Sequence, residues 1–398
     1  MPIPTPFHSR TAALCKSHEW RDWAGYLAAV TYEPTHEREY WAIRNSAGLI
    51  DVTPLFKYEI SGPEALAVVD RIITRDASKC AIGQVLYTPW CNEAGKIVDD
   101  GTLTRLAEDR FRVTAADPNL QWFEDCAFGF DASVRDITAE LGALALQGPL
   151  SLEILRKLAP HAEIEKLKFF RQLETKMAGI PVEITRTGYT GDLGYEVWCA
   201  STHAEKVWDL LMDAGHNYGM LPAGLAALDI SRVEAGFLLA DVDYFSCRKA
   251  VIAPQFSSAY EVGLGWAVKL DKSDFVGKKA LQQEEQRGSQ WAFAGLEIDW
   301  PELEKLFAEF DLPPQITGRA SREGVPIYKN GKQIGKVTSS TFSPILKKYL
   351  ALCTIEAQHA KIGTEIEMEV TVEYRRKKAP ARVAKTPFYD PPRKRATF

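Results

Sequence analysis

The sequence predicts an α+β protein that ends in a small β-barrel or sandwich. Strand-like and helix-like stretches alternate with short connections up to about residue 280. From residue 291 onward the expected elements are nearly all short strands separated by turn residues. The chain has 398 residues, which exceeds the usual size of one domain. Two or three domains are therefore expected.

Apolar periodicity gives the elements of the first part. Helical spacing predicts helices over residues 35–46, 63–73, 119–126, 150–158, 204–214 and 226–235. Apolar runs of strand length predict strands over residues 52–60, 85–90, 97–106, 111–115, 143–147, 181–185 and 197–200. Pro63 stands at the start of the second helix, where its missing N–H is not needed.

The C-terminal part is expected to begin after a polar run at residues 282–289. Short strands are predicted over residues 292–298, 325–329, 333–338, 350–355 and 366–373, with one helix over 301–310. The predicted domains are thus a body, residues 1–285, and a β-barrel, residues 290–398. The body is expected to consist of two intertwined subdomains, the first of them discontinuous.

Composition narrows the class of function. The net charge of -5 argues against nucleic acid as the main partner. No run of 18 apolar residues predicts a membrane span, and the first residues do not resemble a secretory signal. Seven scattered cysteines without a C-x-x-C pair favour neither a disulfide framework nor a zinc site. A cytoplasmic protein without a metal is expected.

A glycine-rich stretch at residues 186–196, R-T-G-Y-T-G-D-L-G-Y-E, is the most informative segment. It joins two expected strands, and its glycines permit tight turns and close approach of a flat ligand. Tyr189 and Tyr195 offer aromatic faces, and Glu196 can accept hydrogen bonds from ring N–H groups. A binding platform and an ordinary hairpin loop both fit this pattern.

An acidic pair, Asp99 and Asp100, lies on an expected strand. Successive strand side chains point to opposite faces, so one carboxylate can enter a cavity while the other meets solvent or caps a neighbour. A buried carboxylate needs a partner or a chemical role. The pair is a candidate site, although an acidic surface turn has the same sequence.

Further motifs extend along the chain in a fixed order. They are D-W-A-G-Y at 22–26, R-N-S-A-G-L-I-D-V at 44–52, S-G-P-E-A at 61–65, C-N-E-A-G at 91–95, D-D at 99–100, A-L-Q-G-P at 145–149, P-A-G-L at 222–225, R-V-E-A-G at 232–236, G-L-G-W at 263–266, G-K-V-T-S at 335–339 and F-S-P at 342–344. With the glycine-rich stretch, this order resembles the aminomethyltransferase (glycine-cleavage T-protein) family of tetrahydrofolate enzymes.

The resemblance implies a three-domain ring around a folate channel, with two mixed α+β domains, one of them ferredoxin-like, and a C-terminal β-barrel. It implies tetrahydrofolate as cofactor. Asp100 matches the family's catalytic aspartate beside the folate N5, where a carboxylate can stabilise developing positive charge or accept a proton. The implied folate-binding residues are Tyr87, Asp100, Tyr189, Glu196 and Trp266. Trp266 and Tyr87 are equally compatible with strand packing.

The departures from the family pattern concern residues expected to contact the substrate that donates the one-carbon group. Pro54 and Leu55 replace the family's His-Met pair, and Leu228 stands where the family's G-A-R-D segment carries arginine. Losing a guanidinium beside the aspartate leaves room for a cationic substrate. Trp198 is a candidate for an aromatic cage around methyl groups. Leu55, Trp198 and Leu228 are therefore the predicted substrate-binding residues.

These features predict an enzyme, a demethylase that moves a methyl group from a small methylated N-, S- or O-substrate to N5 of tetrahydrofolate. An O-methyl substrate would need a general acid, for which Tyr189 is the candidate together with Tyr195. One alternative is an aminomethyltransferase that acts on a lipoyl carrier protein. A more distant alternative is a non-catalytic folate-binding factor for iron–sulfur assembly.

The last 24 residues are strongly basic, with nine Lys or Arg from 375 to 395 against one acid, Asp390. This segment is expected either to be a solvated strand end or to face the glutamate tail of folate.

Overall fold

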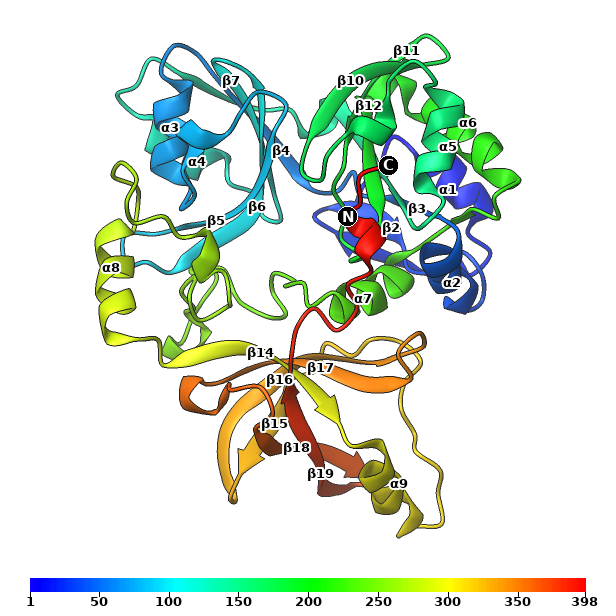
Figure 1. The fold of residues 1–398 in the computed structure, drawn as a ribbon, viewed down its shortest axis with the longest axis vertical. Helices are drawn as coiled ribbons and strands as arrows, with labels where there is room; N and C mark the ends of the chain where they lie inside the picture. The colour runs from blue at the N-terminus through cyan, green and yellow to red at the C-terminus, as the bar shows by residue number, and fades with distance from the viewer.

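The chain forms three parts around a central opening, as shown by a computed structural model that describes residues 1–398 (Figure 1). Two parts are layers of sheet and helices, and the third is a closed six-stranded barrel. The predicted α+β fold with a C-terminal β-barrel is confirmed.

The first layer is a six-stranded sheet, called sheet B here. Its strands run in the order β10 (Gln172–Met177), β11 (Ile180–Thr185), β12 (Gly194–Ala200), β9 (Leu141–Gln147), β3 (Gly48–Asp51) and β13 (Leu221–Pro222). Helices α1 (His8–Leu14), α5 (Ser151–Leu158) and α6 (Ala204–His216) pack with one face of it around 27 buried residues, including Leu144, Val197 and Trp208. Strand β3 of sheet B precedes the five-stranded sheet in the chain, and the other strands of sheet B follow it.

The second layer is a five-stranded antiparallel sheet, called sheet C here. Its order is β5 (Val85–Cys91), β6 (Ile97–Ala107), β7 (Arg110–Ala115), β4 (Phe56–Ser61) and β8 (Ser133–Asp136). Helices α3 (Ala65–Ile72) and α4 (Leu120–Ala127) cover one face, where Val69, Phe111 and Phe123 are fully buried. The opposite face carries polar side chains, because alternate residues in the middle of β6 and along β7 are polar: Asp100, Thr102, Thr104, Arg110, Arg112 and Thr114.

The third part is the barrel. Its strands close in the order β14 (Trp291–Ile298), β17 (Lys348–Glu356), β16 (Lys332–Ser343), β15 (Val325–Lys329), β18 (Glu365–Val372) and β19 (Arg375–Ala384). Helix α9 (Trp300–Ala308) packs on the barrel core through Leu303 and Phe307. Helix α7 (Leu225–Glu234) lies between α2 (Glu37–Asn45) and β16, so it joins the barrel to the body.

Several elements differ from the sequence-based expectation. The polar run expected as a connection is the second half of helix α8 (Lys278–Arg287), which buries Leu281 and ends at Gly288 with φ +80°. Strand β19 was not predicted, since its outward residues are basic and its inward ones, such as Ala379 and Ala381, are small. The hairpin β1 (Trp20–Trp23) and β2 (Tyr26–Ala29) was also missed.

The C-terminal segment leaves the barrel after β19 and crosses to the part that contains sheet B (Figure 1). All seven cysteines are unpaired thiols. None of the helices is both long and apolar enough to cross a membrane. No group of three His, Cys, Asp or Glu side chains lies close enough to hold a metal ion.

Candidate active site

Strands β5 and β6 of sheet C lie beside the opening, and helices α3 and α4 lie on the far side of the sheet (Figure 1). Asp100 lies on β6, on the face opposite these helices. The Asp99 and Asp100 side chains point to opposite faces of β6, as the sequence predicts. Asp99 is buried and accepts hydrogen bonds from the backbone N–H groups of Asp100 (2.8 Å) and Asp117 (2.9 Å) and from the Asn119 amide (2.8 Å). Burial and the neighbouring Asp100 charge raise the pKa of Asp99 well above its usual value. Asp99 therefore fixes the turn after β7.

Asp100 is partly exposed and is held by two phenols. The Tyr87 hydroxyl donates to Oδ2 at 2.6 Å, and the Tyr244 hydroxyl donates to Oδ1. Burial raises the pKa of Asp100, while the two hydrogen bonds oppose that rise. Burial and the Asp100 charge also raise the pKa values of both phenols, so the phenols stay protonated and the carboxylate stays oriented. Tyr244 was not foreseen, because no local pattern sets it apart from a loop residue.

An aromatic pair lies beside Asp100. The rings of Tyr87 and Trp266 have centroids 6.3 Å apart and are tilted by 30°. Trp266 lies in a 3₁₀ turn, not in a strand, and 54% of it is exposed. The Arg75 guanidinium lies 5.5 Å from its ring centroid. An exposed tryptophan next to a partly buried carboxylate is a suitable platform for a flat polar ring.

The glycine-rich stretch forms the loop between β11 and β12. Gly188 and Gly194 both pack against the buried Gln147, where an added Cβ would lie 2.0 and 2.2 Å from its Oε1. The Gln147 amide donates to the carbonyl oxygens of Thr187 (3.2 Å) and Tyr195 (3.3 Å). These two glycines thus admit a protein side chain and not a ligand, which corrects the sequence-based explanation.

The two loop tyrosines have different surroundings. Tyr189 stacks on Phe237 with centroids 5.6 Å apart, and its hydroxyl donates to the Leu238 carbonyl. Burial raises its pKa. Tyr195 is fully buried in the core behind sheet B. The hypothesis that Tyr195 serves as a general acid is therefore wrong.

Glu196 is held from one side. The hydroxyls of Thr187 (2.8 Å) and Thr185 (3.3 Å) donate to its Oε2, and the Trp198 indole N–H donates to Thr185 Oγ1 at 3.2 Å. Oε1 receives no hydrogen bond from the protein. Burial raises the pKa of Glu196. A half-satisfied carboxylate fits a ligand with N–H donors, as a pterin has.

The face of Trp198 is covered by an arginine. The Arg112 guanidinium of β7 lies 4.4 Å from the Trp198 ring centroid and pairs with Glu183 of β11. The Arg112 Nε is buried and has no hydrogen-bond partner. Arg112 was not predicted, although it is the one charged residue in the expected strand 111–115. Because the guanidinium stacks here, Trp198 offers this face to a protein cation instead of a substrate cation.

The remaining predicted substrate residues lie apart from one another in the chain. Leu228 is buried in an apolar cluster that also includes Trp198. The adjacent Asp229 pairs with Arg232 (2.8 Å) and with Arg322 (2.7 Å), which the barrel supplies. Leu55 is partly buried, and its carbonyl accepts a hydrogen bond from Lys57 Nζ at 2.7 Å. Asp229, the residue next to Leu228, is therefore paired with two arginines, one of them from the barrel.

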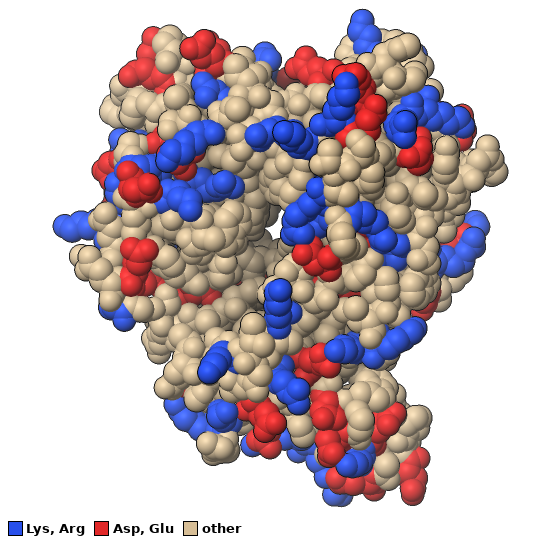
Figure 2. Space-filling model, viewed as in Figure 1, with Lys and Arg blue, Asp and Glu red and all other residues tan.

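The opening itself is visible in the space-filling view. Figure 2 shows a hole at the centre of this face, with Lys and Arg side chains around its rim. A basic rim favours entry of an anionic ligand.

Comparison with known proteins agrees with this geometry. The GCVT N-terminal domain matches residues 8–272, and the glycine cleavage T-protein C-terminal barrel domain matches residues 310–390. The aminomethyltransferase of Halalkalibacterium halodurans is 35% identical over 92% of this chain and 93% of its own length. The aminomethyltransferase of Bacillus subtilis is 34% identical over 92% and 94%, respectively.

Two further relatives are informative. The trimethylamine-oxide aldolase of Ruegeria pomeroyi is 33% identical over 98% of this chain but 47% of its own length. The crystal structure of the glycine cleavage system aminomethyltransferase T from Bartonella henselae superposes with a TM-score of 0.82 at 27% identity, covering 98% of this chain and 99% of that one. The chain belongs to the glycine-cleavage T-protein family, which comprises tetrahydrofolate-dependent one-carbon transferases.

Proposed function

We propose that this protein transfers a one-carbon unit from an amine donor to tetrahydrofolate, and that the unit is a methylene group. The observation that carries this proposal is Asp100, a carboxylate with a raised pKa that two phenols hold at the edge of the opening. Forming a methylene bridge removes protons from both folate nitrogens, which calls for a positioned proton acceptor. The names of the full-length relatives support the same activity.

Folate binding is assigned to residues on both sides of the opening. Tyr87 and Trp266 supply an aromatic platform, and Glu196 presents the free Oε1 to ring N–H groups. Tyr189, stacked on Phe237, forms the wall of the proposed site on the side of the glycine-rich loop. When bound there, tetrahydrofolate supplies the nucleophilic nitrogen N5. Asp100 orients that nitrogen, stabilises positive charge on it and accepts its proton.

The donor side is less polar. We assign Leu228, which is buried in an apolar cluster with Trp198, and the partly buried Leu55 to the side of the reacting carbon. Trp198 acts indirectly by holding Thr185 against Glu196. The Arg112 guanidinium over Trp198 argues against an aromatic cage for a methylated cation at that ring. In the proposed reaction the methylene carbon comes from an aminomethyl group bound to the sulfur of a lipoyl carrier protein. Its C–N and C–S bonds break as the bonds to N5 and N10 form, and ammonia and the carrier thiol leave with the two protons that the folate nitrogens lose.

Demethylation of a small methylated substrate is the second candidate. Leu228, where the family pattern has arginine, favours it, because an apolar residue accepts methyl groups better than a guanidinium does. The relative named trimethylamine-oxide aldolase is compatible with amine substrates in this branch.

Thermal melting with tetrahydrofolate tests the shared part of both candidates. A ligand present at 100 times its Kd stabilises the native protein by about 2.7 kcal/mol. Native protein whose melting temperature does not change in millimolar tetrahydrofolate would refute both. Folate without the reduced ring is the control, since its N5 is an aromatic ring nitrogen that carries no hydrogen.

A further inference from the structure

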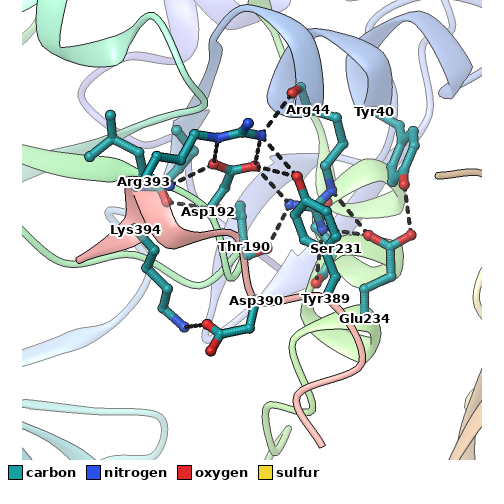
Figure 3. A network of polar contacts seen from close by, with 12 residues as sticks. Tyr40, Arg44, Thr190, Asp192, Ser231, Glu234, Tyr389, Asp390, Arg393 and Lys394 are labelled. Carbon is teal, nitrogen blue, oxygen red and sulfur yellow. Dashed lines mark hydrogen bonds and ion pairs between the residues drawn. The ribbon is translucent and has the colours of Figure 1, made fainter. Parts of the chain in front are cut away.

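The C-terminal segment, residues 389–398, lies against the glycine-rich loop (Figure 3). Arg393 forms a bidentate ion pair with Asp192, with distances of 2.7 Å from Nε to Oδ1 and 2.8 Å from its terminal nitrogen to Oδ2. The Asp192 carboxylate is fully buried. Its partner therefore comes from a part of the chain 201 residues away.

The other end of the same loop is fastened to the same segment. The Arg186 guanidinium donates to the carbonyl oxygens of Ala396 (2.7 Å) and Lys394 (3.3 Å), and it lies 5.3 Å from the Phe398 ring centroid. Arg186 and Asp192 are the first and seventh residues of the R-T-G-Y-T-G-D stretch. The C-terminal segment thus holds the loop at both of its ends.

Between these two points the loop carries Tyr189, which is assigned to folate, and Thr187, which holds the folate-binding Glu196. Tyr189 stacks on Phe237, and the Lys394 ammonium lies 5.0 Å from the Phe237 ring centroid. Thr187 donates to Glu196. A shift of the segment would therefore reach both the aromatic wall and the carboxylate of the folate site.

A buried charge network ties the segment to the body and the barrel. Arg44 Nε donates to Glu234 at 3.0 Å, and a terminal Arg44 nitrogen donates to the Thr190 carbonyl at 2.9 Å. The Tyr389 backbone N–H donates to the Glu234 carbonyl at 2.9 Å, and its ring lies 4.5 Å from the Arg44 guanidinium. The buried carboxylates are Asp192 and Glu234, and the arginines are Arg44 and Arg393. Their charges sum to zero only when Arg393 is paired with Asp192.

We propose that the C-terminal segment is a positioning element of the folate site, with Arg393 as its principal residue. This inference rests on the proposed folate-binding function. Arg393 acts through Asp192 on the loop and does not touch the reacting atoms. Its loss leaves Asp192 buried with Arg44 3.6 Å away as the nearest cation, so the loop loses its fixed position.

The test is calorimetric titration with tetrahydrofolate under anaerobic conditions. Arg393→Gln is expected to raise the Kd by about 10- to 100-fold, the range for losing a charge-assisted hydrogen bond to a buried carboxylate. The matched control is Arg395→Gln, which removes the same charge two residues away, where the side chain is 51% exposed and pairs with Asp390. The control is expected to bind as wild type does.

A positioning role and a merely structural one differ in kinetics. Arg393→Gln is expected to raise the KM for tetrahydrofolate while leaving kcat at saturating folate within about twofold, because Asp100 is untouched. The double variant Asp192→Asn with Arg393→Gln should have a Kd for tetrahydrofolate no higher than that of the single variant that binds more weakly. The reason is that either substitution alone already removes the Arg393–Asp192 ion pair. Arg393→Lys keeps the charge without the fork and should be intermediate.

Reciprocity gives a readout that needs no variant. If the segment holds the folate loop, bound tetrahydrofolate must stabilise the docked segment by the same factor. Carboxypeptidase digestion of wild-type protein should therefore slow when tetrahydrofolate is present. Equal Kd values for wild type and Arg393→Gln, or unchanged digestion with folate bound, would overturn the inference. Wild-type protein that binds no tetrahydrofolate would instead refute the proposed function.

Discussion

Replacing Asp100 with asparagine separates charge from shape at the proposed centre. The variant keeps an oxygen that accepts one phenol hydrogen bond, while the new amide requires the second phenol to turn and accept. The negative charge beside N5 disappears. A single well-placed electrostatic group contributes about 2.7–4 kcal/mol of transition-state stabilisation, so turnover should fall by about 10²- to 10³-fold.

Stability should change in the opposite direction. Burial raises the pKa of Asp100 in the native protein above the unfolded value of about 3.9. Stability from this group is then present below that value and is lost as the pH rises through the raised pKa. Asp100→Asn should therefore melt at a higher temperature than wild type at pH 7, and the difference should vanish near pH 3.

The assay combines single-turnover kinetics with melting curves across pH. Asp99→Asn is the comparison variant, because Asp99 caps the turn after β7 and faces away from the opening. It should keep most of its turnover, because Asp99 does not face the proposed folate site. An Asp100→Asn enzyme with wild-type turnover would refute the catalytic assignment, and so would one whose loss of turnover came with a lower melting temperature.

Three further predictions test the packing around the site. Gly188→Ala should lower the free energy of unfolding by about 1–3 kcal/mol in a urea titration, because the new Cβ meets Gln147. Adding Gln147→Ser to this variant should restore part of the loss. A Gly188→Ala variant as stable as wild type would contradict the close contact. Arg112→Leu should lower stability by about 3 kcal/mol by leaving Glu183 unpaired, and the double variant with Glu183→Gln should lose less, whereas equal losses would exclude a coupled pair. Leu228→Arg should leave the Kd for tetrahydrofolate unchanged but alter the KM for the one-carbon donor, and unaltered donor kinetics would mean that residue 228 does not face the donor.

Much of the architecture was predictable because its signals are local. Helix α3 begins just after Pro63 and buries its apolar stripe, and strands β5 to β7 follow their apolar runs. The side chains of Asp99 and Asp100 on β6 point to opposite faces of the sheet, as strand geometry requires. The barrel was recognisable from its short strands, although β19 was hidden by its outward basic residues.

The parts that were missed depend on contacts between distant segments. The sequence gives no sign that Tyr244 meets Asp100, 144 residues earlier, or that Arg393 meets Asp192. The glycines of the loop were attributed to tight turns and ligand approach. Gly191 does adopt a φ of +74°, but the space beside Gly188 and Gly194 is taken by Gln147. The absent arginine at 228 suggested a missing cation, and the sequence does not reveal that Arg322 from the barrel pairs with the adjacent Asp229. Sequence spacing within one element does not reveal such partners.

The basic C-terminal residues show the same limit. Neither expectation describes the whole segment, since Arg375 and Arg376 lie exposed on the barrel while Arg393 and Lys394 dock against the body. Charge alone did not distinguish the two groups. Their difference lies in which buried carboxylates and rings they meet.

The most direct test of the central claim is the mass of the folate product after turnover. Purified protein would be incubated with tetrahydrofolate and an aminomethyl-loaded lipoyl carrier protein, and in parallel with small N-methylated amines. We predict 5,10-methylenetetrahydrofolate in the first reaction, lost in Asp100→Asn. Formation of 5-methyltetrahydrofolate from a methylated amine, with no product from the carrier, would contradict methylene transfer and establish demethylation in its place.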